Sequence, residues 1–142
     1  LQRRNLEVAA EYHTFQAEYV DPATMRKALV TIFTLPADQQ GKIPVASSDQ
    51  DLNVVVASAE KEMLRQRIKP DAKTLTGPLN FRCLQTVMQE KVVHHLCSTL
   101  YKGRVLEVQP VFMVNDKAFA PAMEKGEALV LEFGKVMANA LK

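Results

Sequence analysis

The sequence of 142 residues has no tryptophan, only two cysteines and only five glycines. It also lacks any uninterrupted apolar stretch of roughly 18 residues, the length that a membrane-spanning helix requires. The charged start of the chain, with Arg3, Arg4 and Glu7, lacks the apolar core of a signal peptide. We therefore expect a soluble protein with no membrane partner. Because the chain begins without Met, we also expect a domain excised from a larger protein.

The common motifs of self-contained enzymes are missing as well. Glycine-rich phosphate loops, Ser-His-Asp spacings, His-Glu-x-x-His and paired-cysteine zinc patterns do not occur. We accordingly expect no catalytic residue, no metal and no cofactor in this domain. A net charge of +2 with a pI near 8.6 is too mild to indicate a nucleic-acid track by itself.

The two cysteines, Cys83 and Cys97, fall in a segment whose pattern indicates one continuous helix. Fourteen helical residues span about 21 Å, which is too far for a disulfide. The sequence thus predicts two free thiols and a reducing compartment.

The length and the apolar fraction of 47% suit one compact domain covering residues 1–142. Residues 6–20 are rich in aromatic and β-branched types and predict one or two strands. Asp21 and Pro22 resemble a helix start, so we expect a helix over about 22–35. A loop over 36–47 follows, and Ser48 with Asp51 predicts a capping box that opens a second helix ending near Ile68.

The segment from Thr76 to Gly103 carries an apolar stripe at helical spacing and predicts a long, buried central helix. Beyond it, alternation over 105–114 and the apolar run 127–133 predict two strands. We expect a short helix or loop over 117–125 and a helical turn or two over 135–141. Together these elements predict an α+β fold, with a small antiparallel sheet packed against about three helices.

The order of these elements resembles the cap-binding domain of the second basic polymerase subunit of orthomyxoviruses, in a divergent, thogotovirus-like form. The likeness covers roughly the first three quarters of the chain and depends on the order and spacing of short pieces. These pieces are Glu11-Tyr12-His13-Thr14-Phe15, Ala23-Thr24-Met25-Arg26-Lys27-Ala28, Gly77-Pro78-Leu79-Asn80-Phe81, His94-His95-Leu96 and Tyr101-Lys102.

In that family two aromatic side chains sandwich the methylated guanine of an RNA cap, while a lysine and a carboxylate read the edge of the base. The resemblance places the lysine on Lys27, the phosphate-proximal histidine on His94 and the carboxylate near His13. The two aromatic positions fall on Ala9 and close to Met63 or Leu64. One-residue gaps would let Glu11 or Tyr12 substitute on one side but not on both, so the sandwich is missing. Loss of two stacking groups, at about 1–3 kcal/mol each, weakens cap binding by several powers of ten.

The resemblance therefore implies a non-catalytic module of a viral RNA polymerase in transcription, with weak or lost cap binding. Its partners would be other polymerase subunits and capped or viral RNA, and its location the host nucleus and the virion. One alternative is a working cap-binding domain for cap snatching, and another is an unrelated intracellular interaction domain.

Each candidate residue also has an ordinary structural interpretation. Lys27 suits an exposed surface lysine, and His95 suits a hydrogen-bonded histidine in the core. His94 and Cys97, three apart on the expected helix, could touch as a nucleophile and base or as two metal ligands. No third ligand or orienting acid accompanies them at a clear spacing.

Overall fold

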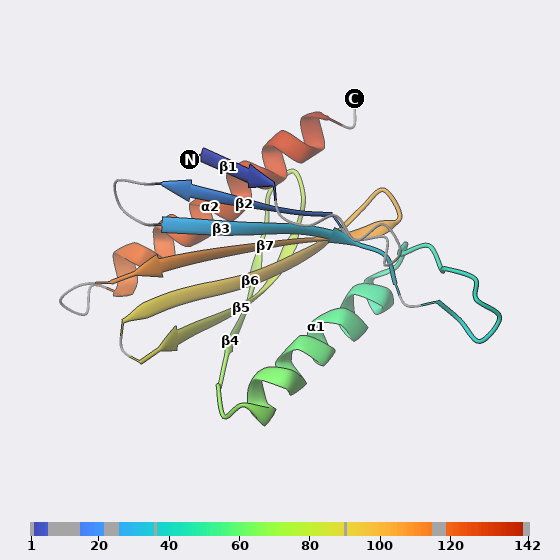
Figure 1. The fold of residues 1–142 in the computed structure, drawn as a ribbon, viewed down its shortest axis with the longest axis horizontal. Helices are drawn as coiled ribbons and strands as arrows, with labels where there is room; N and C mark the ends of the chain where they lie inside the picture. Colours follow the sequence, from blue (N-terminus) through green and yellow to red (C-terminus); the bar gives the residue numbers. More distant parts are fainter. Residues whose placement is uncertain are drawn as a thin grey trace.

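The structure, a computed structural model, describes residues 2–5, 15–21, 26–35, 37–89, 91–114 and 119–140. Seven strands form one sheet, and two helices pack against it (Figure 1). The elements in chain order are β1 (Gln2–Asn5), β2 (Phe15–Asp21), β3 (Arg26–Phe33), α1 (Asp49–Arg65), β4 (Asp71–Leu75), β5 (Phe81–Met88), β6 (Val92–Tyr101), β7 (Arg104–Met113) and α2 (Phe119–Asn139). The predicted α+β class is confirmed, with two helices in the described residues instead of about three.

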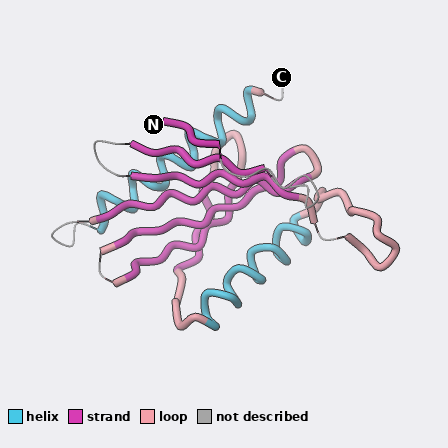
Figure 2. The backbone as a smooth tube through the Cα atoms, viewed as in Figure 1, coloured by secondary structure: helices cyan, strands magenta, loops and turns pink. Residues whose placement is uncertain are grey.

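The sheet order is β1-β2-β3-β7-β6-β5-β4, and every neighbouring pair is antiparallel. The chain builds one side of the sheet with β1 to β3 and then crosses by way of α1 to the far edge. It returns strand by strand from β4 to β7, so that β7 closes against β3. Residues 37–47 form the predicted loop between β3 and α1, which projects away from the sheet (Figure 2).

The two helices lie on opposite faces of the sheet (Figure 1). Side chains alternate between the faces along each strand. On β6, Cys97 points into the core cluster that holds Val130 of α2, whereas His94 and Leu96 line a cavity beside α1. We call these the α2 face and the α1 face.

The main core lies on the α2 face. It joins buried side chains of five strands to α2, namely Val30, Leu75, Phe81, Cys83, Cys97, Leu106, Val108 and Val130. α2 approaches the sheet closely because glycines replace side chains at two contact points. A Cβ on Gly126 would lie 2.5 Å from Cε1 of His95, and one on Gly134 would lie 2.7 Å from Cε2 of Phe81.

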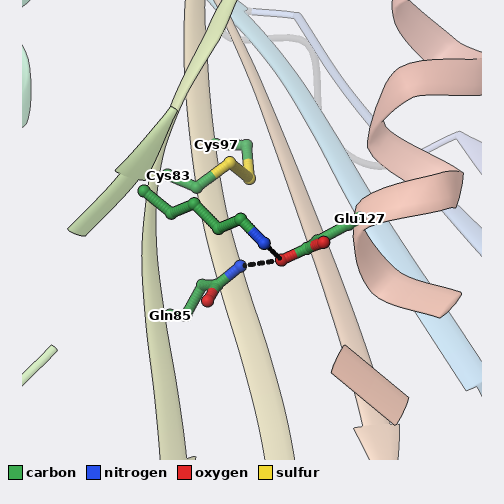
Figure 3. Close-up of a disulfide and its surroundings, with 5 residues drawn as sticks. Cys83, Gln85, Cys97 and Glu127 are labelled. Carbon is green, nitrogen blue, oxygen red and sulfur yellow. Dashed lines mark hydrogen bonds and ion pairs between the residues drawn. A yellow bond between two sulfur atoms is a disulfide. The ribbon is translucent and has the colours of Figure 1, made fainter. Parts of the chain in front are cut away.

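Cys83 and Cys97 form a disulfide inside this core (Figure 3). They are cross-strand partners in β5 and β6, with Cα atoms 4.0 Å apart. The prediction of two free thiols about 21 Å apart is therefore wrong, and the inference of a reducing compartment loses its basis. The cause is the hairpin, since a turn between two strands brings distant positions face to face.

The predicted long helix over 76–103 is wrong for the same reason. Thr86, Val87, Val92 and Val93 are the β-branched residues that strands favour, and β5 has buried residues on both faces, which hides the alternation. Gln89 sits at φ 55° in the turn to β6 without the glycine that usually marks such a position.

Two further helix and strand assignments are corrected. The predicted helix over 22–35 is strand β3 in its described part, because Leu29 to Phe33 is rich in β-branched and aromatic types. The predicted strand over 127–133 lies inside α2, whose length and contact with the sheet outweigh the local apolar run. The capping-box helix, the strand over 105–114 and the strand ending at Val20 are confirmed, the last in its described part from Phe15.

Candidate ligand-binding cleft

Helix α1 begins at a complete capping box. The Ser48 side chain accepts a hydrogen bond from the Asp51 amide, and the Asp51 carboxylate accepts from the Ser48 amide. Leu52 is the only buried residue of this helix, so α1 contacts the sheet mainly near its start. The rest of α1 lies above the sheet without close packing, and space remains between the helix and the strands.

Two adjoining cavities occupy this room. The first has a volume of about 430 Å³ and is lined by Phe33, Thr34, Leu35, Val54, Val55, Ser58, Ala59, Glu62 and Glu107. The second, of about 310 Å³, is lined by Ala59, Glu62, Met63, Gln66, Ile68, Thr86, Met88, His94 and Leu96. They share Ala59 and Glu62, so together they form one cleft along α1, which we call the α1 cleft.

A chain of hydrogen bonds connects the two cavities along the sheet. The Nε2–H of His94 donates to Oε1 of Gln109 at 2.9 Å, and Nε2 of Gln109 donates to Oε1 of Glu107 at 2.7 Å. The Gln109 oxygen can only accept, so Nε2 of His94 must carry the proton. Nδ1 of neutral His94 is then an acceptor. We call His94, Gln109 and Glu107 the polar floor of the cleft.

Burial shifts both ionisable groups of the polar floor toward their neutral forms. Burial lowers the pKa of His94, and the hydrogen bond with Gln109 only partly opposes this shift. Burial raises the pKa of Glu107, again against a smaller effect of Gln109. The cause in both cases is desolvation, which disfavours the charged form.

Buried hydroxyl groups surround the polar floor. Thr31 and Ser98 are the cross-strand neighbours of Glu107, and Thr86 is the partner of His94. Their hydroxyl oxygens have no hydrogen-bond partner within the described residues. Of the three residues, Thr86 alone lines a cavity, whereas Thr31 and Ser98 lie beneath the polar floor.

The structure brings two of the three predicted site residues onto one face. Lys27, Val111, His94 and Thr86 form a continuous cross-strand row on the α1 face. With strands about 4.8 Å apart, Lys27 and His94 are separated by roughly 10 Å along this row. Lys27 is exposed on β3, not on a helix as predicted, and lines neither cavity. His13 lies outside the described residues.

Sequence reasoning missed Glu107 and Gln109, although both stand at alternate positions of the predicted strand over 105–114. Their polar side chains on a strand with buried neighbours were the available signal. The suggested pairing of His94 with Cys97 is wrong, because the two point to opposite faces and Cys97 is in the disulfide.

His95 is a buried histidine of the core, as predicted, but without the expected well-aligned hydrogen bond. It is 0% exposed, and neither ring nitrogen has a partner of good geometry within the described residues. Burial lowers the pKa of His95, and the nearby Glu127 carboxylate partly opposes that shift. Glu127 accepts bonds from Lys73 at 2.6 Å and Gln85 at 2.7 Å, which fasten α2 to β4 and β5 (Figure 3).

A further cavity lies on the α2 face, where Arg26, Phe112 and Lys125 border about 420 Å³. The Arg26 guanidinium lies 5.4 Å from the centre of the Phe112 ring, and Phe112 is itself buried. That ring is therefore covered by Arg26 and does not offer a free face for stacking a base.

Comparison with known protein families, with curated proteins and with solved structures found no match to this chain. Within the described residues, no group of three or more His, Cys, Asp or Glu side chains is arranged to hold a metal ion. No helix among those residues is long and apolar enough to cross a membrane. The class that the fold defines is thus an α+β domain with one sheet between two helices and a cleft on its α1 face.

Proposed function

We propose that this domain is a non-catalytic binding module whose ligand occupies the α1 cleft. The observation that carries the proposal is the polar floor, a hydrogen-bonded chain that joins two cavities with mostly apolar walls. Small-molecule sites typically enclose about 300–1,000 Å³, with apolar walls and a few placed polar groups. The α1 cleft has both properties.

The partial burial of Glu107 supports a binding role over a purely structural one. A carboxyl group that loses water without gaining a cation destabilises the fold. Its only protein hydrogen bond within the described residues comes from a neutral amide. Groups held in this way in a cavity are candidates for contact with a ligand.

A fluorescent titration with N-phenyl-1-naphthylamine, an uncharged apolar probe, tests the proposal. Ala59→Trp places a large side chain at the wall shared by both cavities, and we expect it to abolish binding. Ala57→Trp is the matched control, because Ala57 is exposed on the same helix and lines neither cavity. Equal probe binding by both variants would contradict the proposed site.

The narrower proposal, from the sequence resemblance, is a module of a viral RNA polymerase with the cap-binding fold and weak or lost cap recognition. The specific observation in its favour is that Lys27 and His94 share one cross-strand row. Among the described residues that line the α1 cleft, Phe33 is the only Phe, Tyr or Trp, which favours the weak or lost form. The disulfide weighs against a nuclear location, since disulfides persist in oxidising compartments.

Calorimetric titration with 7-methyl-GTP, with GTP as the control ligand, tests this narrower proposal. We expect no heat, or binding only at millimolar ligand. Micromolar binding with preference for the methylated base, lost in Lys27→Ala, would establish a working cap site and overturn the expectation of weak recognition.

A further inference from the structure

We propose that the α1 cleft selects amphipathic amines, with the ligand's ammonium group against Glu107 and its apolar body along α1. This inference rests on the proposed function, because it names the class of ligand for the same site. The inference requires a ligand with a cationic head group, whereas the proposed function requires only a ligand with an apolar body.

The charges that line the cleft are all of one sign. Glu62 lines both cavities and Glu107 lines the first, while no lysine or arginine of the described residues lines either one. Glu62 already has a cation, since Arg65 Nε donates to its carboxylate at 3.0 Å. Glu107 is the carboxyl group without one, so the charge that would complement the cleft is positive.

The neighbours of Glu107 do not change this balance. Thr31 of β3 and Ser98 of β6 flank it and are uncharged. Arg82 of β5 follows Ser98 in the same cross-strand row, but no salt bridge joins it to Glu107 and it lines neither cavity. From α1 the facing ionisable group is Glu62, and along the polar floor it is His94, whose pKa is lowered by burial. An ammonium group at Glu107 would thus meet a carboxylate, whose oxygens accept hydrogen bonds.

The apolar walls fix where the body of the ligand lies. Phe33, Leu35 and Val55 border the cleft near Glu107, and Met63 and Leu96 border it near His94. Along α1, the lining from Val54 to Gln66 spans about 18 Å at 1.5 Å per residue. That length suits an extended alkyl chain of medium size.

Three ligands with the same ten-carbon chain separate the head group from the body. Decylamine, decanol and decanoate are each used to displace N-phenyl-1-naphthylamine from the full chain at pH 7.5. We expect decylamine to bind about tenfold more tightly than decanol, because hydrogen bonds to charged groups exceed those between neutral groups by about that factor. Decanoate should bind most weakly, since it brings a second negative charge to Glu107.

Glu107→Gln should bring decylamine to the affinity that decanol has for the same variant. Glu60→Gln removes the same charge from an exposed position outside both cavities, so it is the matched control and should keep the preference. Wild-type protein provides a test that needs no variant. Its preference for decylamine should shrink as the pH falls toward 4.5, because protonated Glu107 no longer supplies the negative charge. The other ionisable groups on this face are Glu62 of α1, His94 of β6 and Arg82 of β5.

The outcomes separate this inference from the proposed function. Equal binding of decylamine and decanol, or tighter binding of decanoate, overturns the selection of amines while the apolar binding site remains. Failure of the fluorescent probe and of all three ligands to bind refutes the binding site and the selection together.

Discussion

Reduction of the disulfide between Cys83 and Cys97 should destabilise the domain strongly. The bonded residues are 14 positions apart, so the bond closes a loop of about 15 residues in the unfolded chain. Restricting a loop of that size contributes about 3 kcal/mol through the entropy of the unfolded state. A domain of this kind has about 5–15 kcal/mol of stability in total, so the loss is a large fraction.

Urea unfolding with and without dithiothreitol measures this contribution. With a urea dependence of about 1–3 kcal/mol per molar, the midpoint should fall by roughly 1–3 M in the reduced protein. The two cysteines are 1% and 0% exposed, so reduction should be slow until the protein unfolds.

The variant with both Cys83→Ala and Cys97→Ala is the control, and its midpoint should not respond to dithiothreitol. Thiol titration in denaturant without reductant should find no free thiol in the wild type. Two titratable thiols, or a loss of stability below about 1 kcal/mol on reduction, would refute the reasoning.

Three further predictions concern the helices and the cleft. Gly126→Ala should lower stability by about 1–3 kcal/mol in thermal unfolding, because the added Cβ meets the His95 ring. Adding His95→Ala should relieve this clash. An unchanged stability of the single variant would contradict the contact. Ser48→Ala should lower the free energy of unfolding by about 1 kcal/mol, because the N-cap hydrogen bond is lost. Ser47→Ala is the control and should have no effect. Equal effects of the two substitutions would refute the role of the cap. Glu107→Gln should gain stability relative to wild type as the pH rises from 4.5, because the raised pKa of half-buried Glu107 means that its ionisation destabilises the fold. Parallel curves of stability against pH for the two proteins, measured by urea unfolding, would refute this.

The parts of the fold that were predicted from sequence are those with local chemical marks. Ser48 and Asp51 specify the start of α1 through side-chain hydrogen bonds within one turn. β7 shows alternation because its polar residues Glu107 and Gln109 face the cleft while Leu106 and Val108 face the core. In both cases the decisive interaction lies within a few residues along the chain.

The parts that were missed depend on contacts between distant positions. Phe81, Leu84 and Met88 happen to repeat at helical spacing, yet they belong to a strand whose two faces are both covered. The covering elements, α1 and α2, come from elsewhere in the chain. For the same reason the polar floor was only half predicted, since His94 was singled out and its partners on β7 were not.

The unequal attachment of the two helices has a consequence for motion. α2 is held by three buried positions and by the Glu127 contacts, whereas α1 has Leu52 alone. Amide hydrogens of α1 should therefore exchange with solvent through local opening at a lower free energy than those of β6 or α2. Opening of α1 exposes the cleft without disturbing the disulfide-linked core, so the domain has an entry route that leaves most of its fold intact.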